Sequence, residues 1–172
     1  GRAFSVWIGF VPSDASEPGK TTPAAQAAVA AASTSRMPLT SRTYTQRVHC
    51  GRLRVYLVRH GEAAPGEPDD LRPLTPAGRA AARDLGLRLA AGGARPEAVL
   101  TSPLLRARET AGELARAFDC EVQADERLAP GITTETLREV VTGRGAEIVA
   151  VGHQPDCGRI AAELSGGAEP SF

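Results

Sequence analysis

The stretch L-R-V-Y-L-V-R-H-G-E-A at residues 53–63 decides the fold that we predict for this chain. Residues 55–58 form an almost uninterrupted apolar run, which is typical of a strand buried on both faces of a parallel sheet. The run ends abruptly at Arg59, His60 and Gly61. In open α/β sheets, ligands bind beyond the carboxyl ends of the strands. Taken alone, these three residues could equally be an ordinary polar strand end, so their interpretation depends on the rest of the chain.

Segments with the features of strands and helices alternate over the rest of the chain. Thr75 and Pro76 start a helix as N-cap and first helical residue, and apolar residues follow at helical spacing until Gly92. By the same criteria we expect further strands at 97–101, 121–123 and 147–151, and further helices that begin at Ser102, at Thr133 or Thr134, and at Pro155. This alternation predicts a three-layer α/β/α sandwich with a mostly parallel sheet.

Three of the expected strand-to-helix junctions carry residues that suit anion binding. The first strand ends in V-R-H-G at 58–61, and the strand at 147–151 is followed by Gly152 and His153. The expected strand at 97–101 ends in T-S-P at 101–103 and leads into a helix that carries Arg106. Because parallel strands end at one edge of a sheet, we expect two histidines and two arginines to lie together there. Coincidence explains three such junctions poorly.

Two arginines and two imidazoles beside helix N-termini suit a dianionic phosphoryl group. Each guanidinium can bind the group through two hydrogen bonds, and the helix starts at Ser102 and Gln154 would offer backbone N–H donors. A neutral imidazole is a competent nucleophile near neutral pH, so one histidine could accept the phosphoryl group covalently. The other, if protonated, would bind the oxygens that gain charge in the transition state. This division of work requires no metal ion and no cofactor.

Other chemistries fit the sequence less well. A metal site of His60, Glu62 and His153 would have only three ligands and no recognised spacing. The zinc-deaminase signature, the G-x-S-x-G motif and the phosphate-binding G-x-x-x-x-G-K-[ST] loop do not occur. We interpret Cys157 as a buried structural thiol and the Ser102 side chain as a helix cap. A protein that only binds a phosphorylated ligand would need the arginines but not a histidine nucleophile.

Composition argues against several functional classes. The 20 basic and 20 acidic residues balance, and only 4% of residues are aromatic, so nothing indicates binding to nucleic acid or to a membrane surface. No apolar run approaches the roughly 18 residues of a membrane span. Cys50, Cys120 and Cys157 are odd in number and far apart, which favours reduced thiols in the cytoplasm over a disulfide framework or a zinc site. We expect a cytoplasmic monomer.

The first 51 residues lack sustained periodicity. An Ala/Thr/Ser/Gln tract at 23–35 and a polar segment at 41–47 are typical of disordered chains. We expect residues 1–51 to be a disordered extension or an over-extended start, because Met37 is the only methionine. Residues 52–172 would then form the domain.

Four motifs, in this order, resemble those of a known family. L-V-R-H-G-E at 57–62, L-T-P-A-G at 74–78, S-P-L-L-R-A-R-E-T at 102–110 and V-G-H-Q-P at 151–155 are similar to motifs of the histidine phosphatase (phosphoglycerate mutase-like) superfamily. The compact build and R-P-L-T at 72–75 most resemble its SixA-type phosphohistidine phosphatases. The resemblance implies a phosphoglycerate mutase-like fold. It also implies that His60 is the phosphorylated nucleophile and that Arg59, Arg106 and His153 complete the phosphate pocket.

The chain departs from this family in two ways. Many members carry an acidic proton donor on an insertion after the S-P-x-x-R-A helix, but the corresponding segment here is short, as it is in SixA-type proteins. The nearest substitute lies in the loop after His60, where we favour Asp70 over Asp69 or Glu67. Members also continue past the A-E-P-S-F end at 168–172 with a further strand. We therefore expect the C-terminal strand to be missing and one strand to lack a neighbour.

The pocket and the resemblance together indicate a class of substrate. An alkoxide leaves phosphorus badly without a proton donor, whereas imidazole leaves a P–N bond readily. A pocket without an obvious acid, and without an insertion to cover a small metabolite, suits a phosphohistidine on a partner protein such as a histidine-containing phosphotransfer domain. Two alternatives stay open. One is a broad-specificity phosphatase of small phosphate esters with Asp70 as its acid, and the other is an inactive domain that only binds a phosphorylated ligand.

Overall fold

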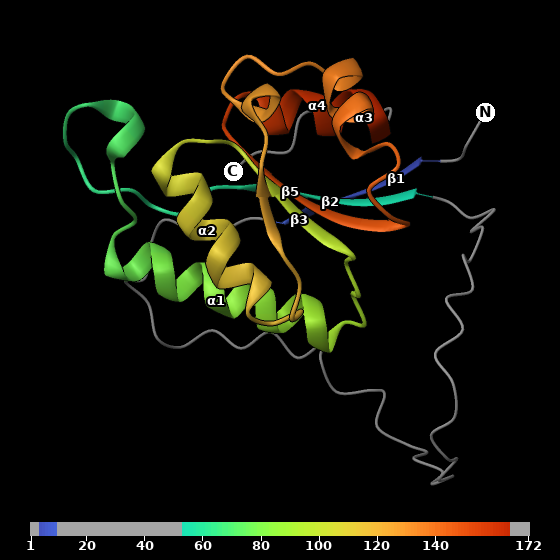
Figure 1. The fold of residues 1–172 in the computed structure, drawn as a ribbon, viewed down its shortest axis with the longest axis horizontal. Helices are drawn as coiled ribbons and strands as arrows, with labels where there is room; N and C mark the ends of the chain where they lie inside the picture. Colours follow the sequence, from blue (N-terminus) through green and yellow to red (C-terminus); the bar gives the residue numbers. More distant parts are fainter. Residues whose placement is uncertain (1–3, 10–52, 166–172) are drawn as a thin grey trace, which may run out of the picture.

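Five parallel strands form the centre of the described structure (Figure 1). The computed structural model describes residues 4–9 and 53–165. The strands are β1 (Phe4–Gly9), β2 (Leu53–Arg59), β3 (Ala98–Thr101), β4 (Val122–Ala124) and β5 (Glu147–Gly152). They lie side by side in the order β1-β2-β5-β3-β4, and all neighbours run parallel. Their carboxyl ends therefore share one edge of the sheet.

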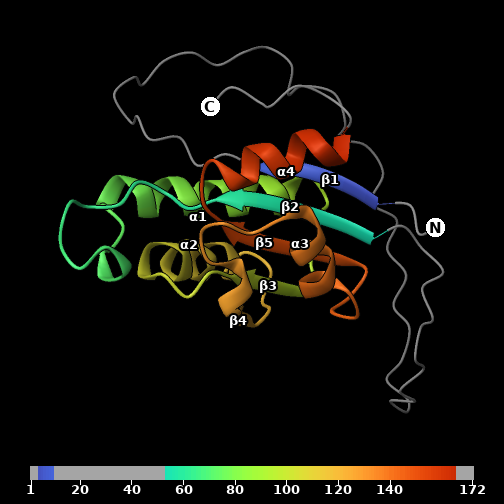
Figure 2. The same ribbon diagram turned by 90° about the horizontal axis from the view of Figure 1, so that it is seen from above.

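Within the described residues, four α-helices cover the two faces of this sheet. On one face lie α1 (Pro76–Ala91) and α2 (Leu105–Ala115), and on the other lie α3 (Thr134–Val141) and α4 (Asp156–Ser165), as Figures 1 and 2 show. Two short 3-10 helices, η1 (Asp69–Leu71) and η2 (Glu126–Leu128), lie in the connections. The predicted three-layer α/β/α sandwich with its parallel sheet is confirmed.

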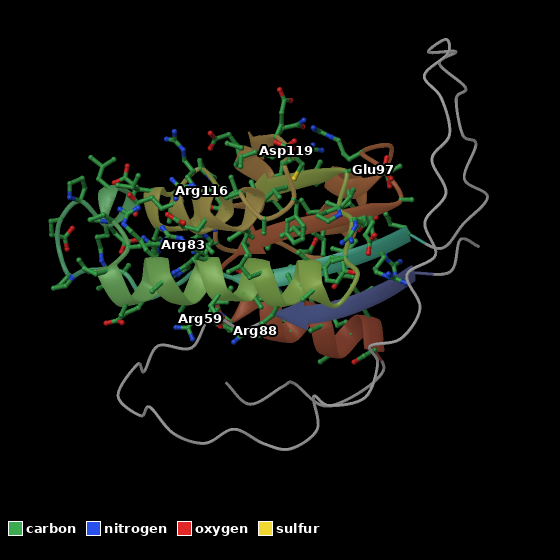
Figure 3. The ribbon with its side chains drawn as sticks, turned by 90° about the horizontal axis from the view of Figure 1, so that it is seen from below. Arg59, Arg83, Arg88, Glu97, Arg116 and Asp119 are labelled. Carbon is green, nitrogen blue, oxygen red and sulfur yellow. The ribbon has the colours of Figure 1, made fainter. Side chains whose placement is uncertain are left out.

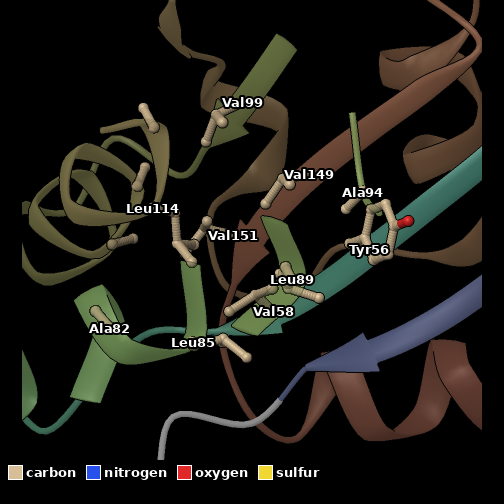
Figure 4. Close-up of a cluster of buried hydrophobic side chains, with 13 residues drawn as sticks. Tyr56, Val58, Ala82, Leu85, Leu89, Ala94, Val99, Leu114, Val149 and Val151 are labelled. Carbon is tan, nitrogen blue, oxygen red and sulfur yellow. The ribbon is translucent and has the colours of Figure 1, made fainter. Parts of the chain in front are cut away.

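Apolar clusters on both faces of the sheet hold the layers together. Tyr56 and Val58 of β2 belong to the cluster under α1 and α2, which Figure 4 shows with its partners from β3 and β5. Val55 and Leu57 alternate with them and belong to the cluster under α3 and α4. Burial on both faces explains why residues 55–58 are all apolar, where a strand with one solvated face would alternate with polar residues.

Local capping signals identified two helix starts correctly and one wrongly. The Thr75 hydroxyl accepts a hydrogen bond from the backbone N–H of Gly78 at 2.9 Å, and Thr133 caps α3 in the same way at 3.2 Å. The helix predicted to begin at Ser102 begins only at Leu105. The chain continues along the sheet for longer than the Ser-Pro signal suggests, so the helix begins later.

β1 corrects the expectation that residues 1–51 all lie outside the domain. Phe4–Gly9 pairs in parallel with residues 53–58, so β2 has a neighbour on each side instead of an unpaired edge. F-S-V-W-I-G is rich in β-favouring residues, but six residues are too few for periodicity to stand out. Residues 10–52 and 166–172, on which the other expectations about the two ends of the chain fall, lie outside the described residues.

Gly78, in the first turn of α1, lies against the loop that follows β2. A Cβ atom at this position would lie 2.3 Å from the backbone oxygen of Glu62 and 2.9 Å from its nitrogen. The Thr75 N–H donates to the same Glu62 oxygen at 2.9 Å. This close approach of two backbones sets the start of α1 against the residues that follow His60.

Gly78→Ala should destabilise the protein by about 1–3 kcal/mol, the range for overpacking, because the contacted backbone atoms cannot rotate away. Gly112→Ala in α2 is the matched control, since nothing lies within 4 Å of a Cβ there. The control should stabilise its helix by roughly 0.5–1 kcal/mol. Urea unfolding followed by circular dichroism measures both changes. Equal midpoints for the two variants would contradict the importance of the close approach.

Candidate active site

The carboxyl edge of the sheet brings together the histidines and arginines that the sequence predicted to meet. Arg59 ends β2 and pairs with the last residue of β5, so His60 and His153 follow neighbouring strands. Their ring centroids lie 5.1 Å apart. Arg106 reaches His60 from α2. Figure 3 shows Arg59 at this edge and Glu97 at the opposite edge, just before β3 begins.

Hydrogen bonds hold the His60 ring with its proton on Nδ1 and its lone pair on Nε2. Nδ1 lies 2.7 Å from the carbonyl oxygen of Gly61, which can only accept, so Nδ1 carries the proton. Nε2 is therefore unprotonated, and Arg106 Nε donates to it at 3.3 Å. Burial lowers the pKa of His60, and the charges of Arg106 and Arg59 lower it further, although the bond to Gly61 acts in the opposite direction. A neutral imidazole with a lone pair on Nε2 is the form that a nucleophile requires.

Thr110 ties the helix that carries Arg106 to the loop that follows His60. Its hydroxyl donates to the carbonyl oxygen of Arg106 at 2.7 Å and accepts from the backbone N–H of Gly61 at 3.0 Å. The side chain is fully buried. Thr110 therefore fixes the distance between α2 and the loop that follows His60. Sequence reasoning missed this role, although the motif at 102–110 ends on this residue.

Ser102 does not offer its backbone N–H to a ligand, contrary to the prediction. The N–H donates to the carbonyl oxygen of Val151 at 3.1 Å, because pairing between β3 and β5 extends to this residue. Its buried hydroxyl lies 2.7 Å from Nε2 of His153, with a longer contact of 3.4 Å from the N–H of Leu104. Ser102 thus orients the second histidine, and the N-cap position of α2 belongs to Leu104.

His153 is neutral at neutral pH in this structure. Burial lowers the pKa of His153, and its interactions with His60 and Arg106 lower it further, to about 4. A protonated second histidine, as the sequence suggested, therefore requires an arriving anion to raise this pKa. Within the described part of the chain, Nδ1 of His153 is buried and has no hydrogen-bond partner. Such an atom can serve an oxygen of a ligand.

The structure brings Asp69, not the predicted Asp70, against Arg106. One oxygen of Asp69 accepts from Arg106 at 3.0 Å and the other from Arg72 at 2.9 Å. The hydrogen bonds to Arg72 and Arg106 lower the pKa of Asp69, so it is ionised at neutral pH and a poor proton donor. The exposed Asp70 side chain makes no hydrogen bond or ion pair with residues 4–9 or 53–165. Neighbouring residues of the η1 turn point in different directions, which the sequence does not reveal.

A cavity of about 280 Å³ lies among these residues. It is lined by Arg59, His60, Gly61, Glu62, Ala63, Arg72 and Arg106. Sequence reasoning missed Arg72, although R-P-L-T at 72–75 was part of the resemblance. The Nε atom of Arg72 donates to the carbonyl oxygen of Ala64 at 2.8 Å, which holds the guanidinium at the cavity. Three guanidinium groups around one reactive imidazole suit a multiply charged oxyanion.

The structure also places the residues that were considered for a structural or a metal-binding role. Cys157 is buried, and burial raises its pKa to about 12, which agrees with a structural thiol. Among residues 4–9 and 53–165, no three His, Cys, Asp or Glu side chains lie close enough together to hold a metal ion. None of the helices in these same ranges has the length and apolar character needed to cross a membrane.

Comparisons with known proteins agree on one family. The family model described as histidine phosphatase superfamily (branch 1) matches residues 55–144. The phosphohistidine phosphatase SixA of Escherichia coli K12 is 30% identical over 125 residues, which cover 69% of this chain and 78% of SixA. An uncharacterized protein of Picosynechococcus is 38% identical over 123 residues, which cover 67% and 74% of the two chains. A solved structure of the protein histidine phosphatase SixA with tungstate matches with a TM-score of 0.62 at 29% identity, over 69% of this chain and 81% of that one.

The depressed pKa of His153 predicts how stability depends on pH. The unfolded chain takes up a proton near the ordinary histidine pKa of about 6.5, whereas folded His153 does so only near pH 4. Stability should therefore be full above about pH 6.5 and fall as the pH drops from there to about 4. Titration of the imidazole signals by NMR measures the pKa directly, and His153→Asn identifies the signal. The pKa should rise when tungstate is added, and a value near 6.5 in the free protein would contradict the prediction.

Proposed function

The chain belongs to the histidine phosphatase superfamily, and we propose that it is a phosphohistidine phosphatase of the SixA type. Phosphatase activity follows from the family and from the similarity to the E. coli protein. We further propose that the phosphoryl group is held covalently on His60, that no metal ion takes part, and that the protein acts as a cytoplasmic monomer. The observation that carries this proposal is the unprotonated Nε2 of His60, which lies beside Arg106 in a cavity that Arg59 and Arg72 also line.

The first half of the reaction transfers the phosphoryl group to the protein. Nε2 of His60 attacks phosphorus, the P–Nε2 bond forms, and the bond from phosphorus to the leaving group breaks with both electrons on the leaving group. The ring becomes positively charged, and its Nδ1–H remains bonded to the carbonyl oxygen of Gly61, which stabilises that charge. The guanidinium groups around the cavity bind the phosphoryl oxygens. His153, once protonated by the presence of the anion, donates to a further oxygen.

The second half releases inorganic phosphate. A water molecule attacks phosphorus from the side vacated by the leaving group, and the P–Nε2 bond breaks with its electron pair returning to His60. The proton lost by the water passes to the departing phosphate or to solvent. His60 is then neutral again, with its proton on Nδ1. Neither half requires a group beyond the residues of the cavity, His153 and water.

The state of Asp69 supports phosphohistidine as the substrate. Its carboxylate is held ionised by two arginines, so it cannot readily protonate a leaving group. An alkoxide needs such a proton, whereas an imidazole can leave with its other nitrogen already protonated. The named activity of the E. coli relative is of the same kind. We propose that the partner is a protein that carries phosphohistidine, such as a histidine-containing phosphotransfer domain.

Hydrolysis of small phosphate esters is the second candidate, and Glu62 is the observation that favours it. This carboxylate lines the same cavity as His60 and Arg106. Its side chain makes no hydrogen bond to the described residues, so no partner in that part of the chain holds it away from a leaving group in the cavity. In that reaction it would take the role that the sequence assigned to Asp70.

His60→Ala should lower turnover of a phosphorylated histidine-containing phosphotransfer domain by at least about a thousandfold, because the nucleophile is lost. His49→Ala, which removes the remaining histidine of the chain, is the control and should retain activity. Rapid acid quench of the wild-type protein should trap about one equivalent of acid-labile phosphate per site. Activity that survives in His60→Ala, or that disappears on addition of a chelator, would contradict the proposed mechanism.

A side-by-side measurement of kcat/KM separates the two candidate substrates. A phosphorylated phosphotransfer domain should be hydrolysed orders of magnitude more efficiently than any of a panel of phosphate monoesters. Glu62→Gln should leave hydrolysis of the phosphohistidine nearly unchanged, since imidazole needs no acid. If a monoester is the better substrate, and Glu62→Gln removes that activity alone, the protein is a small-molecule phosphatase.

A further inference from the structure

Asp69 occupies the hydrogen-bonding groups of Arg106 that a phosphoryl group would use. Two nitrogens of the guanidinium donate to Asp69, one to the carboxylate at 3.0 Å and one to the backbone oxygen at 2.7 Å. The third, Nε, donates to His60 at 3.3 Å. The second carboxylate oxygen of Asp69 accepts from Arg72 at 2.9 Å. A negatively charged group therefore already bridges two of the three arginines that line the cavity.

The two partners differ in how firmly the fold holds them. The Arg106 side chain is 9% exposed, whereas that of Asp69 is 58% exposed. None of the three residues of η1, the turn that carries Asp69, is buried. Withdrawal of Asp69 would thus sacrifice little apolar packing, but it would leave a buried guanidinium without an anion, which is costly. An incoming phosphoryl group removes that cost, because it supplies the negative charge as Asp69 departs.

We propose that Asp69 is an internal competitor for the phosphoryl group at Arg106 and thereby sets how tightly this site holds a phosphoryl ligand. This inference rests on the proposed function, in which Arg106 binds the phosphoryl group of the substrate. Each phosphoryl ligand must displace the Asp69 carboxylate before it gains the full set of arginine contacts. The apparent affinity is reduced in proportion to the fraction of molecules in which Arg106 is free.

The reduction affects every phosphoryl ligand by the same factor, but its consequences differ between ligands. Free phosphate and small esters have only the phosphoryl contacts, so the competition lowers their already limited affinity and speeds release of the phosphate product. A protein substrate can compensate through contacts outside the cavity. Leu71, 60% exposed in the same turn as Asp69, offers an apolar contact close to the cavity. The competition leaves the ratio of the two affinities unchanged, but only a ligand with contacts outside the cavity still binds tightly.

Asp69→Asn tests this competition, with Asp70→Asn as the matched control in the same turn. Asparagine retains the size of the side chain and the backbone contact to Arg106 but removes the competing charge. Isothermal titration with inorganic phosphate should give about tenfold tighter binding to Asp69→Asn, equivalent to about 1.4 kcal/mol. The control should bind phosphate as the wild-type protein does. In steady-state assays, the inhibition constant of phosphate should fall by the same factor in Asp69→Asn.

Phosphate binding to Asp69→Asn that is no tighter than to the wild-type protein, or that is undetectable, overturns the proposal. Weaker binding would instead make Asp69 a residue that positions Arg106 for the ligand. Thermal unfolding of both variants establishes that they are folded, which the exposure of the two side chains leads us to expect.

Arg106→Ala separates failure of the competition proposal from failure of the proposed function. If Arg106→Ala loses phosphate binding while Asp69→Asn gains none, only the competition is wrong, and if Arg106→Ala binds normally, the phosphoryl site itself is wrong.

Discussion

The buried guanidinium of Arg106 is the charge on which the rest of this site depends. Its side chain is 9% exposed, and a buried charge without a partner costs several kcal/mol. The fold satisfies it in three directions, through the carboxylate and backbone of Asp69 and through the ring of His60. One cation therefore positions the ring of His60 and holds the loop with η1 at the cavity. A guanidinium in this position can bind a phosphoryl group through two hydrogen bonds.

The same positive charge explains the protonation of the two histidines. Burial is the main reason that the pKa of each ring is lowered, and Arg106 adds to it in both cases. A neutral His60 suits nucleophilic attack, whereas a neutral His153 cannot yet act as a cationic donor. In the mechanism that we propose, an arriving dianion would raise the pKa of His153. Binding of the anion and protonation of the second histidine would then be one electrostatic event.

Buried hydroxyl groups and close backbone contacts convert this arrangement of charges into a rigid site. Thr110 joins α2 to the loop after β2, and Ser102 holds the ring of His153. Gly78 allows α1 to approach that loop more closely than any other residue would. The arginines come from a strand end, a helix and a loop, so their convergence requires that all three elements keep their places.

Much of this protein could be predicted from the sequence, because the relevant signals are local or follow from the topology. The apolar run 55–58 and the threonine caps of α1 and α3 specify their own elements. The carboxyl ends of parallel strands lie at one edge of the sheet. Residues that follow two neighbouring strands, such as His60 and His153, therefore lie close together.

Only the tertiary structure decided which neighbouring residue faces the cavity and what each polar group binds. Asp69 and Asp70 are adjacent residues of the same type, so the sequence does not distinguish them. The turn of η1 alone directs Asp69 toward Arg106. The hydroxyl of Ser102 finds a partner 51 residues away, and its N–H is taken by β5 rather than left free at a helix start. Hydrogen bonds and pKa values depend on distances of a few ångströms between distant parts of the chain, and no local pattern of residue types records those distances.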